Sequence, residues 1–361
     1  MSNQSLSQDP QSLVQLVDPL LAWYDKNARV LPWREDPAPY RVWISEIMLQ
    51  QTRVEAGKPY FERFVAALPT IEALAGADEQ QLLKLWEGLG YYNRVRNLQK
   101  AAILVMEQYD GILPSDPAHL QKLPGIGAYT AGAIASIAFG VVAPSVDGNV
   151  LRVFARLLND DRDILSPALK KEWEGMIKAI IPPNRAGDFN QALMELGATV
   201  CLPNGAPLCL TCPLNGLCVG YACGTAPQLP KKTPKAKRKK QAYTVLLLTC
   251  EGKAALHLRP AKGLLAGLWE FPLAEGHLNN NNAEGHVIAM GFAPLSISYL
   301  GEAQHIFTHV EWDMIGYCVE VAYPHAAEDI VWASLEEIGS IYPLPSALRA
   351  YIGQLPKLLQ L

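Results

Sequence analysis

The chain has 361 residues, half of them hydrophobic, and a net charge of −4, so it is long enough for two domains of ordinary size. No apolar run is long enough for a transmembrane helix, and the first twenty residues lack the basic start and apolar core of a secretory signal. We therefore expect a cytoplasmic protein with no membrane partner, whose seven cysteines stay reduced.

The charge is distributed unevenly along the chain. Residues 1–224 carry 19 Lys/Arg and 23 Asp/Glu, residues 225–240 carry seven and none, and residues 241–361 carry five and twelve. The net charges of these segments are therefore −4, +7 and −7. Binding to nucleic acid would have to depend on local basic clusters and backbone phosphate sites rather than on the field of the whole molecule.

The spacing of apolar residues predicts helices first and strands later. The predicted helices cover residues 13–24, 42–51, 59–67, 78–87, 94–108, 128–139, 149–158, 168–180 and 188–200. The predicted strands cover 243–250, 254–258, 269–273, 297–300, 305–314 and 317–322, with a loop at 279–282 and helices at 335–338 and 347–359. An all-helical domain (1–224) is thus followed by a Pro- and Lys-rich linker (225–241) and an α+β domain (242–361).

Glu46 is placed within an apolar stretch of the helix at 42–51, beside Ile44, Ile47 and Met48. A carboxyl group buried there would have a raised pKa, which suits a general acid. The alternative is that Glu46 lies on an exposed stripe of the helix.

The turn at Gly88-Leu89-Gly90-Tyr91-Tyr92 also has two interpretations. Its aromatic side chains could pack in the core. They could equally form a wedge that enters a stack of nucleic-acid bases.

Residues 123–149 contain the most informative pattern. Pro124 and Gly125 end one apolar helix, and Gly127 precedes another. Unpaired N–H groups near Gly125 and Gly127, together with the helix dipole, are typical of a phosphate site. Asp147 follows in a turn that opens the next helix, so it could also serve only as an N-cap.

Five cysteines lie close together after the last helix of the first domain. Cys201, Cys209, Cys212 and Cys218 have the spacing of a four-thiolate site, and Cys223 follows them. Spacing alone does not separate structural zinc from an iron–sulfur cluster, whereas disulfides are disfavoured in a reducing compartment. We expect the remaining two cysteines to be buried small side chains.

Taken together, these segments resemble the MutY family of adenine DNA glycosylases, within the helix-hairpin-helix base-excision superfamily. The resemblance covers nearly the whole chain; it is carried by residues 31–34, 45–52, 88–92, 123–149 and 189–197 and by the cysteines. It implies a two-lobed, all-α helix-hairpin-helix core with a [4Fe–4S] cluster on four cysteines, followed by an α+β Nudix-like domain. The implied partner is duplex DNA with adenine opposite 8-oxoguanine or guanine, and we expect a monomer.

The resemblance also assigns roles to residues in the helical domain. Glu46 would protonate the flipped adenine, and Asp147 would stabilise the positive charge that develops on the sugar. Tyr129 stands where related lyases carry a Lys, which implies a glycosylase that hydrolyses the N-glycosidic bond without cutting the strand. The resemblance also implies six substrate-binding residues in this domain. Trp33, Arg34 and Glu195 are expected at the adenine, and Gln51 and Tyr91 near 8-oxoguanine. Thr52 is the sixth.

The C-terminal domain carries two further motifs. Residues 267–272 are Nudix-like, but residues 273–277 supply one carboxylate, so pyrophosphohydrolase activity is not expected. Phe307-Thr308-His309 resembles the loop of the family that reads 8-oxoguanine, with Thr308 where Ser is usual; the alternative is a Thr-His pair at the end of a strand.

The cysteine spacing departs from the family by one residue. Seven residues separate Cys201 from Cys209, where the family usually has six, which leaves Cys223 as an alternative fourth ligand. Three other functions are disfavoured. Tyr129 and the Nudix-like domain argue against an endonuclease III-like lyase, and a non-catalytic iron–sulfur DNA-binding protein would not explain Glu46 together with Asp147. A nucleotide hydrolase would need the acidic residues that the Nudix-like segment lacks. The basic run at 231–240 could be a nuclear localisation signal, but we favour a linker that contacts DNA phosphates.

Overall fold

The computed structural model describes residues 10–203, 205–233, 237–325 and 329–359. Its contacts divide the chain into two compact units: Met1–Gly76 with Asn97–Pro234, and Ala77–Arg96 with Lys235–Leu361. None of the helices among the described residues has the length and apolar character needed to cross a membrane.

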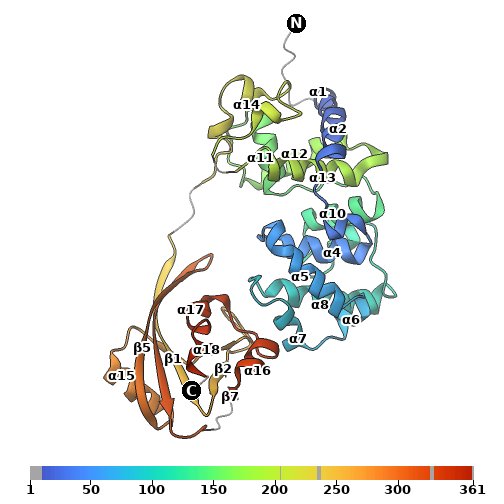
Figure 1. Ribbon diagram of the computed structural model, residues 1–361. Coiled ribbons are helices and arrows are strands. Elements are labelled where there is room, and N and C mark those ends of the chain that lie inside the picture. Colours follow the sequence, from blue (N-terminus) through green and yellow to red (C-terminus); the bar gives the residue numbers. More distant parts are fainter. Residues whose placement is uncertain (1–9, 204, 234–236, 326–328, 360–361) are drawn as a thin grey trace. The chain divides into compact units, whose positions relative to one another are not determined.

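The first unit is helical (Figure 1). Its α-helices are α1 (Pro10–Leu13), α2 (Val17–Asn27), α3 (Pro32–Glu35), α4 (Pro39–Leu49), α5 (Val54–Ala67), α6 (Ile71–Ala75), α9 (Pro117–Leu120), α10 (Ala128–Phe139), α11 (Gly148–Leu157), α12 (Pro167–Ile180), α13 (Ala186–Thr199) and α14 (Val219–Ala222), with most of α8 (Asn93–Gln108). Every helix predicted before residue 200 is present, whereas α3, α6, α9 and α14 were not predicted because each has only four or five residues.

Helix α10 is the centre of the first unit. It packs against both α4 and α13 (Figure 1), and its residues from Thr130 to Ser136 are all buried. The predicted turn precedes it: Gly125 has φ +80°, and a Cβ atom there would lie 2.9 Å from the Cβ of Asn97. Helix α11 packs against α13 as well. The arrangement therefore brings the start of α11 and the inner faces of α4, α10 and α13 together.

The second unit contains a seven-stranded mixed sheet. Its strands are β1 (Lys239–Cys250), β2 (Lys253–Leu258), β3 (Trp269–Glu270), β4 (Leu273–Glu275), β5 (Pro294–Ile306), β6 (Val310–Val321) and β7 (Ile330–Ala333). The order is β3-β2-β1-β6-β5, with β4 on β1 and β7 on β2, and β1 and β6 are the parallel pair. The helices are α7 (Glu79–Leu85), α15 (Asn280–Ala289), α16 (Leu335–Ser340), α17 (Arg349–Ile352) and α18 (Leu355–Leu358).

The sheet has a hydrophobic core on each face. Along β1, Val245 and Leu247 belong to one core, and Leu246 and Leu248 belong to the other. This alternation is the consequence of the two-residue period of a strand. The first core is completed by Leu348, Tyr351 and Leu355 near the C-terminus, and the second by residues of α15.

Three sequence predictions in this unit were wrong. The loop at 279–282 is the start of α15, where the Asn279 side chain accepts a hydrogen bond from Asn282 N at 3.0 Å. The strands at 305–314 and 317–322 are instead β5, a turn, and one continuous β6. Gly316 does not break β6; a Cβ atom there would meet the ring of Tyr351 at 2.2 Å, so glycine makes room for that ring. The helix at 347–359 is divided into shorter pieces.

Residues 77–96 also differ from their predicted place, because their contacts put them in the second unit. Trp269 Nε1 donates to Gln80 Oε1 at 3.1 Å, and Leu344 N donates to Glu87 Oε1 at 2.8 Å. Lys84 Nζ donates to the carbonyl of Ile338 at 2.8 Å. The segment belongs to the second unit because its polar side chains bond residues far away in the sequence. Such distant partners cannot be identified from the residues next to them in the sequence.

Candidate active site

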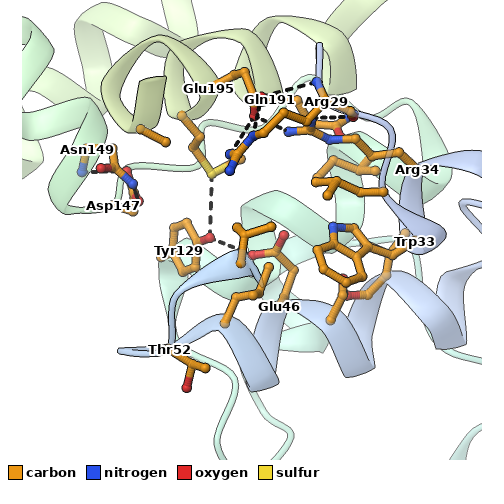
Figure 2. A pocket seen from close by; sticks show the side chains of 18 residues that line it. Arg29, Trp33, Arg34, Glu46, Thr52, Tyr129, Asp147, Asn149, Gln191 and Glu195 are labelled. Atoms are coloured by element: carbon orange, nitrogen blue, oxygen red, sulfur yellow. Dashed lines mark hydrogen bonds and ion pairs between the residues drawn. The ribbon is translucent and has the colours of Figure 1, made fainter. Parts of the chain in front are cut away.

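A cavity of about 140 Å³ lies in the first unit, where α3, α4, α10, α13 and the start of α11 meet (Figure 2). Eighteen residues line it, and seven of them were predicted from the sequence to act on or bind substrate. These seven are Trp33, Arg34, Glu46, Thr52, Tyr129, Asp147 and Glu195. The two proposed catalytic carboxyl groups therefore share one cavity, as the sequence analysis required.

Glu46 is buried in this cavity, with 7% of its surface exposed. Burial raises the pKa of its carboxyl group to about 7, the nearby charge of Asp147 acts in the same direction, and the hydrogen bond from Tyr129 opposes the rise. Tyr129 Oη donates to Glu46 Oε2 at 2.5 Å and fixes the carboxyl group (Figure 2). A carboxyl group with this pKa can hold a proton near neutral pH and give it up, which is what a general acid must do.

Asp147 has a more polar environment at the N-cap of α11. Its Oδ1 atom accepts hydrogen bonds from Asn149 N at 2.9 Å and Val150 N at 2.8 Å, and its Oδ2 atom accepts from Asn149 Nδ2 at 2.7 Å. Burial raises the pKa of Asp147, and these hydrogen bonds counteract the effect. The capping and catalytic interpretations are therefore compatible, since capping fixes the position of the carboxylate in the cavity.

The opposite wall carries a buried carboxylate held by two arginines. Arg29 Nε and Nη2 donate to Glu195 at 2.6 and 2.9 Å, and Arg34 Nη2 donates at 2.8 Å (Figure 2). Burial alone would raise the pKa of Glu195, but the hydrogen bonds from Arg29 and the charge of Arg34 outweigh it and hold the pKa below its ordinary value. Gln191 Oε1 accepts from Arg34 Nε at 2.9 Å. This wall therefore presents an ionised acceptor beside fixed donors.

A chain of hydrogen bonds runs from Asp147 toward the cysteines. Asn149 Nδ2 donates a hydrogen bond to Asp147 Oδ2, and Arg152 Nη2 donates to Asn149 Oδ1 at 2.8 Å. Arg152 Nε donates to the carbonyl of Cys201 at 2.7 Å. Helix α13 comes close here, since a Cβ atom on Gly197 would lie 2.5 Å from the Cβ of Asn149. The position of Asp147 is thus tied to the backbone at the first cysteine.

Four cysteines line a second, apolar cavity in the first unit. These are Cys201, Cys209, Cys212 and Cys218, while Cys223 is exposed and does not line it. Arg156, itself 2% exposed, directs Nη1 at the Cys201 sulfur at 3.2 Å. Burial raises the pKa of Cys212 to about 12, so its thiol is protonated until a metal displaces the proton. Among the described residues, no group of three or more His, Cys, Asp or Glu side chains is already arranged around a metal position.

The predicted DNA-contacting residues of the first unit lie outside the cavity that contains Glu46 and Asp147. Gly127 is the N-cap of α10 with extended backbone, and a Cβ atom there would meet nothing within 4 Å. Gln51 is exposed just after α4 and has φ +61°. A left-handed backbone at a residue other than glycine is uncommon, and such conformations recur at functional sites.

In the second unit, two predicted recognition residues lie side by side although 217 positions separate them in sequence: Tyr91 Oη is 3.1 Å from Thr308 Oγ1. Tyr91 is 50% exposed and, like Gln51, has a left-handed backbone, with φ +49°. Thr308 and His309 are exposed in the turn between β5 and β6, whereas Phe307 packs against Trp312 with ring centroids 5.0 Å apart. The turn is therefore anchored by Phe307 and presents the next two side chains outward.

Three site residues were missed by the sequence analysis. Arg29, Asn149 and Gln191 line the catalytic cavity and bond the predicted residues Glu195, Asp147 and Arg34. Asn149 and Gln191 lie within segments already singled out, so their amide groups were an available signal. Arg29 lies just before the motif at residues 31–34, and only its pairing with Glu195, 166 positions away, identifies it.

Comparisons with known proteins agree with this geometry. Residues 44–178 match the model of the HhH-GPD superfamily base excision DNA repair protein, and residues 243–354 match the NUDIX domain. The chain is 37% identical to adenine DNA glycosylase of Rattus norvegicus over 81% of this chain and 68% of that protein. It is 34% identical to the Homo sapiens enzyme of the same name over 99% and 77%.

A solved non-covalent endonuclease III–DNA complex shares the helical fold. The protein in that complex is 27% identical, and the match covers 60% of this chain and 98% of that one with a TM-score of 0.51. The identities to the adenine enzymes extend over most of both chains, and they include the Nudix-like domain. The chain therefore belongs to the adenine DNA glycosylase family of helix-hairpin-helix base-excision repair proteins.

Proposed function

We propose that this protein binds duplex DNA and excises adenine paired with 8-oxoguanine or guanine, by hydrolysis of the N-glycosidic bond. The observation that carries the proposal is the shared cavity of Glu46, whose pKa is about 7, and the hydrogen-bonded Asp147. A glycosidic bond inside a duplex cannot be reached, so the adenine must be flipped into this cavity.

The wall opposite Glu46 suits the edge of an adenine. The base offers an exocyclic amino group as donor and ring nitrogens as acceptors, and Glu195 with Arg29 and Arg34 offers the complementary groups. The indole of Trp33, packed edge-on against Phe61 with centroids 5.2 Å apart, adds a flat apolar surface. Arg29 extends the set of adenine-binding residues beyond those predicted from the sequence.

In the reaction, Glu46 donates its proton to the adenine ring, which turns a poor leaving group into a good one. The bond breaks with its electron pair going to adenine, and positive charge develops on the sugar. The Asp147 carboxylate stabilises that charge, and water then adds to the sugar carbon and gives its proton to the Glu46 carboxylate, which restores the acid. The two carboxyl groups take different parts because one is dry and the other is surrounded by hydrogen-bond donors.

Tyr129 supports Glu46 and cannot replace the amine of a lyase. Its phenol has no nitrogen with which to form a Schiff base, and its oxygen already bonds Glu46. We expect no strand cleavage after incubation without heat or alkali. Strand cleavage by the protein would instead favour the endonuclease III-like activity.

We propose that exposed residues contact the base opposite the adenine. Gln51, Tyr91, Thr308 and His309 would contact 8-oxoguanine, and the backbone at Gly125 and Gly127 would hold a phosphate. Each of these positions is exposed to solvent. We expect the protein to act as a monomer, since one chain supplies every proposed role.

The decisive experiment replaces Glu46 with Gln and compares it with the exposed Glu62→Gln on α5. Glu46→Gln should lower adenine release from an A:8-oxoguanine duplex by about 100- to 10,000-fold and leave binding of that duplex intact. Glu62→Gln should behave as the unchanged protein. Unchanged turnover in Glu46→Gln would remove the proposed mechanism and favour a non-catalytic DNA-binding protein.

We also propose a [4Fe–4S] cluster on Cys201, Cys209, Cys212 and Cys218. Four sulfur donors around one apolar cavity, with the Arg156 guanidinium beside one of them, fit a negatively charged thiolate cluster. When bound, the cluster would cross-link the end of the helical unit. Iron content and visible absorption should survive Cys223→Ser and be lost in Cys201→Ser; zinc bound in place of iron would contradict the assignment.

A further inference from the structure

The basic linker ends in a fixed position rather than as a loose tether. Lys237, Arg238, Lys239 and Lys240 are all exposed, and the last two begin strand β1. Lys239 lies opposite Val310 and Lys240 opposite Glu311 in the parallel pairing of β1 with β6. Since Val310 directly follows His309, this pairing places the end of the linker beside the turn that carries Thr308 and His309.

Direct hydrogen bonds join the linker to that turn. Arg238 Nε donates to the carbonyl of Phe307 at 3.1 Å, and Lys239 N donates to the carbonyl of His309 at 3.1 Å. Both bonds leave the terminal nitrogens unused. Within the part of the chain that the structure describes, Nη1 and Nη2 of Arg238 and Nζ of Lys239 have no partner. Two cations are therefore held at the turn with their charged ends in solvent.

The charge around the turn makes this placement significant. Residues 241–361 carry a net −7. Glu311 lies on β6 beside the turn, and Asp313 and Glu302 lie further along β6 and β5. Lys240 Nζ is 3.4 Å from Glu311 and offsets one of these carboxylates. In a domain of negative net charge, Arg238 and Lys239 thus supply positive charge beside the two residues expected to approach DNA, which favours the approach of phosphates.

We propose that Arg238 and Lys239 bind backbone phosphates of the DNA strand whose base is read by Thr308 and His309. The inference rests on the proposed function, because that function brings the turn to the DNA. Phosphate contacts position a protein on the duplex and carry no base information. The pair therefore sets the register of the turn, while Thr308 and His309 choose the base.

The test measures the salt dependence of binding with the full-length protein. The probe is an A:8-oxoguanine duplex whose target adenosine carries a 2′-fluorine, which disfavours positive charge on the sugar and prevents turnover. Each lost phosphate contact should lower the slope of log Kd against log salt by about 0.9. In the double variant Arg238→Gln/Lys239→Gln this slope should thus be smaller by about 1.8. Binding of the matching A:G duplex should be weakened by the same factor.

Two variants separate charge from local structure. Lys253→Gln removes an exposed charge opposite Cys250, at the far end of β1, and should leave the slope unchanged. Arg238→Lys keeps the charge but loses the Nε bond to Phe307, and it should keep the slope of the unchanged protein. Lys253→Gln and the double variant lowering the slope equally would overturn the inference.

A structural role alone gives a different result. If Arg238 and Lys239 only hold the turn, the double variant keeps the original slope and alters the ratio of A:8-oxoguanine to A:G binding; that result also overturns the inference. Failure of the proposed function is distinguishable, since it appears as no adenine release by the unchanged protein from the same duplex without fluorine. Release by that protein together with an unaltered slope in the double variant rejects only the phosphate contact.

Discussion

The cavity around Glu46 and the turn at Phe307–His309 are both expected to meet a DNA base, yet they are built in opposite ways. Glu46 is 7% exposed and held by a side-chain hydrogen bond, whereas Thr308 and His309 are exposed and held by backbone pairing and the packing of Phe307. The cavity changes the proton affinity of its groups. The turn only positions groups whose ordinary chemistry is enough.

This difference teaches what each task requires. Proton transfer to a base needs a carboxyl group whose pKa lies near the working pH, and burial is the means of raising it. Reading a base needs access and a fixed backbone, so burial would be a disadvantage. Substitutions in the cavity should therefore alter the rate of base release by orders of magnitude, and substitutions in the turn should alter preference by small factors.

After Glu46→Gln, the largest effect is expected from Asp147→Asn. Asparagine keeps one oxygen that can accept the N–H groups of Asn149 and Val150, so the cap of α11 should be kept, whereas the bond from Asn149 Nδ2 to Oδ2 is lost. The charge that stabilises the sugar is lost, and single-turnover adenine release should fall about 100- to 1,000-fold. Asp161→Asn, the same change at an exposed position, serves as control. Near-normal release by Asp147→Asn would show that the cavity does not act through charge.

The next effect is the pH dependence of the same step. Glu46 acts in its protonated form, so with a pKa of about 7 the rate should fall about tenfold per pH unit above that value. The hydrogen bond from Tyr129 lowers this pKa, and Tyr129→Phe should therefore move the midpoint upward, by about one unit. Tyr60→Phe, a tyrosine outside the cavity, should leave the midpoint in place. A downward shift in Tyr129→Phe would contradict the assigned role of the hydrogen bond.

Local sequence patterns were sufficient for the elements and for part of the cavity. Glu46 stood out because Ile44, Ile47 and Met48 surround it in sequence, and all four residues are buried. Asp147 stood out because a short side-chain acceptor before a helix is a local signal. Both signals depend on neighbours within one turn of helix, which is the range that periodicity covers.

Contacts between distant segments had no such signal. The pairing of Arg29 with Glu195 and the approach of Tyr91 to Thr308 join residues 166 and 217 positions apart. Strand β6 was predicted in two parts, 305–314 and 317–322, and the purpose of Gly316 between them, space for the Tyr351 ring, depends on a residue elsewhere in the chain. Only the fold brings such partners together, and a single sequence carries no record of it.

In the turn, the hydroxyl group of Thr308 is the first feature to remove. Thr308→Ala deletes the oxygen that lies 3.1 Å from Tyr91 Oη and faces solvent. We expect the preference for A:8-oxoguanine over A:G, measured as the ratio of kcat/KM values, to fall about 2- to 10-fold, which is the worth of one neutral hydrogen bond. Adenine release from A:G should change little. An equal loss on both duplexes would mean that Thr308 supports the turn rather than reads the base.

The smallest effect is expected from Thr308→Ser, which separates the hydroxyl group from the methyl group. Serine keeps the oxygen and can reach the same partner, while the exposed methyl group contributes little burial. The preference ratio should therefore stay within about twofold of the unchanged protein. If Thr308→Ser lowered the ratio as much as Thr308→Ala does, the methyl group would be the contact that matters. The turn would then distinguish the two bases by shape rather than by a hydrogen bond. It would differ even more from the cavity, where hydrogen bonds and charge do the work.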